Sequence, residues 1–359
     1  MVDRPGNSGT AVLVSLDFAD TRSRESVDEL RELTLSARIR PLQVIGGKRI
    51  RPDAATFAGS GKVEEIATAV AATQATLVIF NHDLSAAQQR NLERVLQVPV
   101  VDRTTLILDI FAQRARSHEG KLQVELAQLE RLSTRLIRGW THLERQKGGI
   151  GLRGPGETQL ETDRRLLARR VKRLKERLDH FRSQRAVQSR SRTRSDVLKV
   201  ALVGYTNAGK STLFNRLTHA ETFCADQLFA TLDTTTRKVF LAADLPLVVS
   251  DTVGFIRHLP HTLVAAFGAT LEETAKADLL LHVVDAAHPR RDEQMQEVNA
   301  VLEQIGASAI PQVTVFNKVD RHELAPELFA EAEEQHGGQH DDDGAIEGQD
   351  LGQRTALRR

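Results

Sequence analysis

The sequence contains a single cysteine, Cys224, among 359 residues. One thiol can form neither an intrachain disulfide nor a metal site built from several cysteines, so the sequence indicates a reducing compartment. No apolar run approaches the roughly 20 residues that a bilayer-spanning helix needs. Residues 1–10 mix charged residues, proline and glycine without the apolar core of a secretory signal. We therefore expect a cytoplasmic protein without a transmembrane segment, and peripheral association with a membrane stays open.

Net charge is also low, at +1 for the whole chain, but it is unevenly distributed. Residues 112–195 carry 22 Lys and Arg against 9 Asp and Glu, a net charge of +13, and the remainder of the chain sums to −12. Most of these cations are arginines, whose planar fork suits phosphate. The basic segment favours a polyanionic partner, with nucleic acid as the leading candidate.

The length predicts more than one hydrophobic core. In the first part of the chain, strand-like apolar runs at 11–18, 76–80 and 98–102 alternate with helix-like stretches at 23–37, 85–97 and from Thr104 onward. This alternation predicts βαβ units and a small parallel sheet, an N-terminal α/β domain over residues 11–110.

A short segment inside this domain, Gly59 to Lys62, faintly resembles the end of a phosphate loop. It lacks the first glycine at the right distance. We interpret it as a turn entering a helix at Val63, and a phosphate or RNA contact is the alternative.

The second segment, residues 111–195, has apolar residues at heptad spacing. Two such series predict long helices paired as an antiparallel hairpin, a coiled-coil arm. Five glycines within 148–156 predict a mobile tip about 20 residues, or ~30 Å, from the base. A plain spacer with a solvated charged face is the alternative, and residues 183–195 are expected to be a linker. The series are Leu122, Leu126, Leu129, Leu136, Trp140 and Leu143, and Leu160, Leu167, Val171, Leu174, Leu178 and Phe181.

The third segment opens with an apolar strand at 197–203 that leads into GYTNAGKS, the GxxxxGKS pattern of a phosphate loop. Backbone amides at the start of the following helix face the phosphates, Lys210 reaches the β- and γ-phosphates, and Ser211 ligates Mg²⁺. The strand–loop–helix setting makes chance a poor explanation.

A second apolar strand ends at Asp251 in the sequence DTVG. This carboxylate can hold Mg²⁺ through water, while the Gly254 amide senses the γ-phosphate. Between the two motifs, Thr231 can reach Mg²⁺ through its hydroxyl, and Thr234, Thr235 and Thr236 are competitors for that role.

Two further strands, DLLLHVVDAA and PQVTVFNKVD, continue the parallel sheet, and the last ends in NKVD. Asp320 can accept hydrogen bonds from the guanine ring N–H and amine, whereas adenine would leave its carboxylate unpaired. NKVD therefore indicates guanine, and its place as the third motif in order strengthens a four-letter match.

The sequence resembles the translation-factor-related branch of P-loop GTPases in GYTNAGKST, DQLFATLD, DTVGF and NKVD, and the HflX family of ribosome-associated GTPases in GGIGLRGPGETQLETDRR. The resemblance covers roughly residues 11–330. It implies that the N-terminal domain and the hairpin dock on the large (50S) ribosomal subunit and its rRNA, with the tip near the peptidyl-transferase region. It also implies that the GTP-bound protein helps split stalled or stress-damaged ribosomes.

The resemblance implies bound GTP or GDP, with Mg²⁺ held by Ser211 and Thr231. We expect Lys210, Thr231 and Gly254 to be the catalytic residues. The nucleotide contacts that it implies are Gly204, Tyr205, Thr206, Asn207, Ala208, Gly209, Lys210, Ser211, Phe229, Ala230, Thr231, Leu232, Asp233, Asp251, Thr252, Val253, Gly254, Asn317, Lys318, Val319 and Asp320.

Phe255 stands where Ras-like enzymes place a glutamine that orients the attacking water. Phenylalanine cannot hydrogen-bond water, so we expect slow hydrolysis alone and acceleration by a partner. We interpret the neighbouring Arg257 and His258 as switch-region surface, and a catalytic role for either is the alternative.

The GTPase domain is expected over residues 197–334, without the final strand and helix of a Ras-like domain. Residues 335–359 are polar and glycine-rich, which predicts a disordered tail. A premature stop or a frameshift is our hypothesis for this end of the chain, and it puts activity in question.

The sequence therefore predicts a monomeric, ribosome-coupled GTPase, because the heptads can pair within the chain, and no DNA partner is expected. One alternative is an RNA-binding adaptor with an inactive nucleotide domain. Another is an RNA-dependent ATPase or remodeller, against which NKVD argues.

Overall fold

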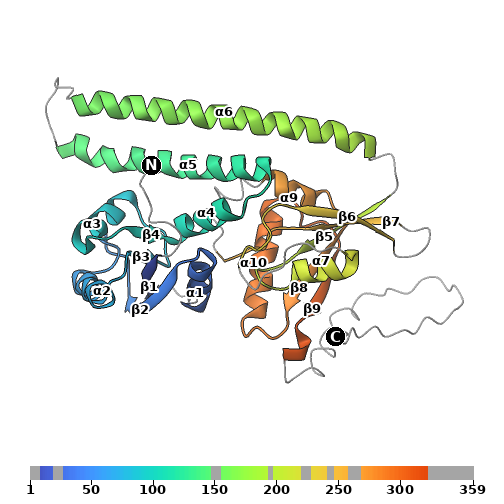
Figure 1. Ribbon diagram of the computed structural model, residues 1–359, viewed down its shortest axis with the longest axis horizontal. Helices are drawn as coiled ribbons and strands as arrows, with labels where there is room; N and C mark the ends of the chain where they lie inside the picture. The colour runs from blue at the N-terminus through green and yellow to red at the C-terminus, as the bar shows by residue number, and fades with distance from the viewer. Residues whose placement is uncertain are drawn as a thin grey trace, which may run out of the picture.

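The computed structural model describes residues 9–18, 27–146, 155–192, 197–219, 228–240, 246–257 and 268–321. Figure 1 shows two α/β units side by side beneath a pair of long helices, of which α5 lies against the units and α6 lies outside α5. Cys224, His258, most of the glycine-rich tip and the tail at 335–359 lie outside the described residues.

The N-terminal unit is a parallel four-stranded sheet in the order β2-β1-β3-β4. Its elements are β1 (Thr10–Phe18), α1 (Val27–Ser36), β2 (Arg40–Arg49), α2 (Ser60–Thr73), β3 (Leu77–Phe80), α3 (Ala86–Leu96), β4 (Val100–Asp102) and α4 (Arg103–Arg114). Both faces of β1 are buried, because Val12 and Val14 pack into one core and Ala11 and Leu13 into another. This two-sided burial explains the continuous apolar run of β1.

The prediction of strands at 11–18, 76–80 and 98–102 is confirmed, but β2 was missed. This strand lies at the sheet edge and is mostly half-exposed, so it carries charged residues, a proline and two glycines in place of an apolar run. Helix α2 also begins three residues earlier than expected, at Ser60.

The arm consists of α5 (His118–Gln146) and α6 (Pro155–Arg192). Near its base the predicted seam is confirmed, with Leu122 and Leu126 buried against Leu174 and Leu178. Leu129, Val171 and Phe181 pack on this cluster. The predicted contacts of Leu136, Trp140, Leu143 and Leu160 lie outside the described side chains.

The linker predicted at 183–195 is wrong for most of its length, because α6 continues to Arg192. Arginine, glutamine and alanine are good helix formers, and they outweigh the serines among them. In the described part of the chain, no helix combines the length and apolarity needed to cross a bilayer.

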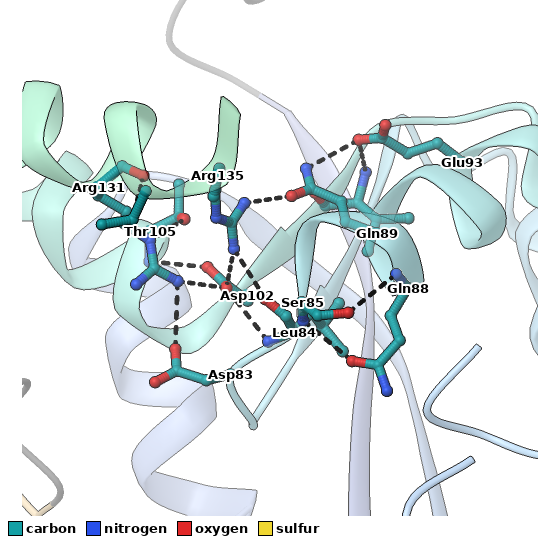
Figure 2. Close-up of polar contacts among 12 residues, drawn as sticks. Asp83, Leu84, Ser85, Gln88, Gln89, Glu93, Asp102, Thr105, Arg131 and Arg135 are labelled. Atoms are coloured by element: carbon teal, nitrogen blue, oxygen red, sulfur yellow. Dashed lines mark hydrogen bonds and ion pairs between the residues drawn. The ribbon is translucent and has the colours of Figure 1, made fainter. Parts of the chain in front are cut away.

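Helix α5 is tied to the N-terminal unit through a buried ionic cluster (Figure 2). The Asp102 carboxylate at the end of β4 accepts hydrogen bonds from Arg131 and Arg135 of α5. It also accepts from the backbone N–H groups of Thr105 at 3.0 Å and Leu84 at 3.3 Å. The cluster fixes the arm on the sheet edge.

The C-terminal unit is a five-stranded sheet in the order β6-β7-β5-β8-β9. Its elements are β5 (Leu198–Val203), α7 (Lys210–Thr218), β6 (Thr235–Phe240), β7 (Pro246–Asp251), α9 (Gly268–Ala275), β8 (Leu279–Asp285), α10 (Arg291–Gln304), β9 (Gln312–Asn317) and a 3₁₀ turn (Val319–Arg321). The four predicted strands are parallel, as expected. The sequence interpretation missed β6, an exposed edge strand that runs antiparallel to β7.

Candidate nucleotide-binding site

The loop between β5 and α7 has the backbone of a phosphate loop. Gly204 has φ +148° and Gly209 has φ +98°, conformations that L side chains rarely adopt. A Cβ atom on Gly204 would lie 2.2 Å from the Val283 carbonyl oxygen, and one on Gly209 would lie 2.1 Å from Nδ2 of Asn317. Both positions therefore require glycine.

Lys210 begins α7 and is almost completely buried. Its Nζ donates to the carbonyl oxygens of Gly204 at 3.0 Å and Tyr205 at 2.7 Å. Burial lowers the pKa of this ammonium to about 8, and the nearby Asp251 carboxylate opposes the shift. An anionic phosphate beside Nζ would relieve this burial cost, as a phosphate-binding lysine requires.

Three oxygen-bearing side chains meet beside Lys210. The Ser211 hydroxyl donates to Oδ2 of Asp251 at 2.6 Å and lies 2.7 Å from the Thr231 hydroxyl. Oδ1 of Asp251 is buried without a hydrogen-bond partner. Burial raises the pKa of this carboxyl, against the opposing Ser211 hydrogen bond and Lys210 charge. Hydroxyl and carboxylate oxygens with unused acceptor capacity suit Mg²⁺.

The other threonines lie farther along the same segment. Thr235 and Thr236 belong to β6, where the Thr236 hydroxyl pairs with that of Ser250 at 3.2 Å. The fold therefore brings Thr231, among the four candidates, to Ser211. Within the described residues no cluster of three or more His, Cys, Asp or Glu side chains forms a separate metal site.

A pocket opens at this point and gathers many of the predicted residues. Its walls are Thr206, Asn207, Gly209, Lys210, Ser211, Thr212, Phe229, Ala230, Thr231, Thr252 and Gly254. Thr212 was missed, although its place directly after Ser211 in the first turn of the helix was a signal. A Cβ atom on Gly254 would lie 2.8 Å from the Thr206 Cα atom and 3.1 Å from Nζ of Lys210. The Gly254 backbone thus closes the pocket against the phosphate loop.

The NKVD residues begin at the last residue of β9, and the first two of them donate hydrogen bonds to the phosphate loop. Asn317 donates to the Ala208 carbonyl oxygen at 2.9 Å. Lys318 Nζ donates to the Asn207 carbonyl oxygen at 2.8 Å and to Asp285 at 2.7 Å. Asp320 is exposed in the following 3₁₀ turn. The first two residues hold the loop, and the last presents its carboxylate to the exterior.

Three residues that were predicted to contact the nucleotide have side chains that contact other parts of the protein. Leu232 is buried in the core. The Asp233 carboxylate accepts hydrogen bonds from the N–H groups of Arg116 and Ser117, each at 2.8 Å. Tyr205 donates its hydroxyl proton to Glu29 of α1 at 2.6 Å. Nucleotide contacts of these three residues can therefore come only from the backbone.

The segment after DTVG is more enclosed than its interpretation as switch-region surface suggests. Phe255 is fully buried. The Arg257 side chain is 13% exposed and lies 3.4 Å from both Glu293 and Glu297 of α10. Its backbone N–H donates to the Tyr205 hydroxyl at 2.9 Å, and its carbonyl oxygen accepts from Arg103 at 3.2 Å. The sequence did not indicate these contacts of Arg257, because its acidic partners lie far away along the chain.

Three family models match the chain in succession. They describe a GTP-binding GTPase N-terminal region at residues 24–112, a GTP-binding GTPase middle region at 114–192 and a 50S ribosome-binding GTPase at 199–318.

Among curated proteins, the chain is 59% identical over 320 residues to the GTPase HflX of Escherichia coli, covering 89% of this chain and 75% of the relative. It is 50% identical over 302 residues to the GTPase HflX of Alkalihalophilus pseudofirmus, covering 84% and 71%. Among solved structures, the crystal structure of SsGBP with GDP matches with a TM-score of 0.53 and 25% identity, covering 90% of this chain and 86% of that one.

Proposed function

Because the chain belongs to the HflX family of GTPases, which are P-loop GTP hydrolases, we propose that it is a GTP-driven switch that docks on the large ribosomal subunit and helps split stalled ribosomes. The nucleotide part of this proposal rests on Lys210, Ser211 and Thr231, which line one pocket, and on Asp251, which accepts a hydrogen bond from Ser211.

Binding and catalysis in this proposal depend on positioning. Lys210 and the loop amides bind the β- and γ-phosphates, and the Gly254 amide reads the γ-phosphate. Ser211 and Thr231 would hold Mg²⁺ directly, and Asp251 would hold it through water. When bound, Mg²⁺ neutralises charge that develops on the phosphoryl oxygens.

Specificity and rate follow from two other residues. The Asp320 carboxylate accepts hydrogen bonds from guanine, while Asn317 and Lys318 keep the phosphate loop next to it. Phe255 is buried and offers no polar group to the attacking water. Hydrolysis is therefore slow until a partner orders the site.

The solvent-exposed surface of α6 supports rRNA as that partner. It exposes a dense set of arginines at Arg164, Arg165, Arg169, Arg170, Arg173 and Arg177. Among the described side chains, Glu125 and Glu130 of α5 pair with Arg170 and Lys175 of this helix. Such a surface neutralises RNA phosphates, with affinity that falls as salt rises. A monomer in the cytoplasm, without a DNA partner, fits this role.

The test is GTP hydrolysis by the full chain, with and without purified 50S subunits, and with ATP as competitor. We expect stimulation by 50S subunits that excess ATP does not suppress. Binding to 50S subunits without any GTP turnover would favour the RNA-binding adaptor. Suppression by ATP would favour the RNA-dependent ATPase.

Splitting needs a separate measurement, because stimulation shows only docking. Light scattering of 70S ribosomes, mixed with the protein and a non-hydrolysable GTP analogue, should fall as subunits separate. Unchanged scattering at saturating protein would contradict the splitting proposal and leave GTP hydrolysis intact.

A further inference from the structure

The loop that carries Thr231 makes contacts on two sides. On one side Thr231 lies 2.7 Å from the Ser211 hydroxyl at the predicted Mg²⁺ site. On the other side residues 228–233 contact the N-terminal unit and the start of the arm. The Leu228 N–H donates to the Ser36 hydroxyl at 3.0 Å, and the Phe229 ring packs edge-on against Phe111 at 4.6 Å between centroids.

The contact with the arm is made by Asp233. Its carboxylate accepts the backbone N–H groups of Arg116 and Ser117 and the Ser117 hydroxyl. That hydroxyl in turn accepts the N–H of Gly120 at 2.8 Å, so Ser117 caps the first turn of α5. A Cβ atom on Gly120 would lie 2.3 Å from Oδ1 of Asp233, which shows how closely the loop seats.

The electrostatics of a helix start favour this arrangement. The first N–H groups of an α-helix have no partner in the helix, and the helix dipole attracts negative charge there. A carboxylate from the nucleotide domain thus completes the N-terminus of an arm helix 29 residues long. Releasing it would leave the cap incomplete and a carboxylate without its three donors.

The spacing makes the two sides of the loop dependent on each other. Thr231 and Asp233 are two residues apart, which an extended chain spans in about 7 Å. Thr231 therefore cannot withdraw far from Ser211 while Asp233 stays on the arm.

We infer that Ser117 and Asp233 are positioning residues that couple the arm to the nucleotide site, holding Thr231 beside Ser211 for GTP and releasing it with GDP. A partner that fixes the arm then strengthens GTP binding, and GTP strengthens binding of that partner by the same factor. The coupling is a property of the chain alone, so it is tested without ribosomes.

The first test compares the affinity of the full chain for a non-hydrolysable GTP analogue with its affinity for GDP. Ser117→Ala should lower the preference for the analogue about tenfold, within the range of coupled sites. Ser117→Thr keeps the hydroxyl and should restore the preference. Ser183→Ala is the matched control, because this exposed arm hydroxyl donates only to Asp179 in its own helix.

A double-mutant cycle adds the second residue. Asp233→Asn combined with Ser117→Ala should change the preference no more than the larger single effect, because the Ser117 hydroxyl acts through its hydrogen bond to the Asp233 carboxylate. If the double variant lost as much preference as the two single variants added together, the inference would be overturned. So would an unchanged preference in Ser117→Ala, or equal losses of both affinities, which would indicate a purely structural cap.

Hydrogen exchange on the unmodified protein gives an answer even where a variant fails to fold. The amides of Arg116 and Ser117 should exchange at least about tenfold more slowly with the GTP analogue than with GDP, because only the former state keeps the Asp233 contact. Equal exchange rates in the two nucleotide states would overturn the coupling.

Discussion

The two sheets of this molecule use the edge at the carboxyl ends of their parallel strands for opposite purposes. In the C-terminal sheet, the carboxyl ends of β5 and β7 lead to a pocket lined by the phosphate loop, Thr231 and Gly254. In the N-terminal sheet, the carboxyl ends of β3 and β4 lead to Asp102, which is covered by Arg131 and Arg135 of the arm (Figure 2). Parallel topology offers a crevice at this edge, and the groups that fill it decide whether a ligand can enter.

The two units also share a Gly–Lys pair at the start of a helix. Gly209 and Lys210 belong to a loop with positive φ angles, whereas Gly61 and Lys62 lie inside α2, and its N-cap Gly59 has an ordinary φ of −68°. Lys62 donates to the Gly46 carbonyl oxygen at 2.9 Å and to Glu65 at 2.6 Å. Backbone conformation, rather than residue identity, separates the phosphate loop from this helix start, where Ser60 and Lys62 already belong to α2 instead of the expected turn.

The largest effect on stability is expected at Asp102, where the arm covers the edge of the N-terminal sheet. Asp102→Ala should destabilise the N-terminal unit and the arm base by about 3–5 kcal/mol, because it leaves two arginines without their buried partner. Hydrogen exchange across α3, α4 and α5 measures the loss. The matched control is Glu125→Ala, which removes an exposed pair with Arg170 and should cost less than about 1 kcal/mol. Similar small losses in both variants would contradict the structural role of this edge.

The next largest effect is expected in GTP affinity, when replacement of Lys210 is compared with replacement of Lys62. Lys210→Ala should weaken GTP binding at least about 100-fold, because a buried cation no longer faces the phosphates. Lys62→Ala should leave GTP affinity unchanged. Fluorescent-nucleotide titration measures both. A loss of GTP affinity in the Lys62 variant would show that the N-terminal unit also takes part in nucleotide binding. It would contradict the contrast between the Gly–Lys pairs of the two units.

A smaller effect comes from a buried histidine of the C-terminal sheet. His282 pairs with Val203 where, in the other sheet, Phe80 pairs with Val14. Burial lowers the pKa of His282 to about 4, and the Lys210 charge acts in the same direction. Its unfolded pKa is higher, so the unfolded state binds more protons between about pH 4 and 6.5, and stability falls as pH falls through that window.

The expected loss from His282 is about 2 kcal/mol by pH 5. Urea denaturation at a series of pH values measures it. His282→Gln should flatten this acid limb, and an unchanged pH slope in the variant would assign the acid sensitivity to other groups.

The smallest effect is expected at Gly61. A Cβ atom there would meet nothing within 4 Å, so Gly61→Ala should stabilise the protein by about 0.5–1 kcal/mol through better helix propensity. Thermal unfolding of both forms measures the difference. Destabilisation would mean that the α2 start needs its glycine, as Gly204 does in the phosphate loop.

Much of the nucleotide site could be predicted because its signals are local. The strand, glycine loop and helix around Lys210 occupy consecutive residues, and each glycine has a steric reason visible in the fold. Edge strands β2 and β6 could not be predicted, because half-exposed residues show no apolar run. The expectation that the GTPase domain lacks a final strand and helix concerns residues after 321, which lie outside those described.

By itself the sequence determined the order of the units, the basic helical arm, and the guanine-nucleotide motifs with their spacing, because these depend on periodicity and short loops. Only the tertiary structure decided that Thr231 meets Ser211, that acidic residues enclose Arg257, and that Asp233 contacts Ser117. Asp233 and Ser117 are separated by 116 residues, and no local pattern encodes a hydrogen bond of that range. Such contacts form only when sheet packing brings the start of α5 against the loop that carries Thr231.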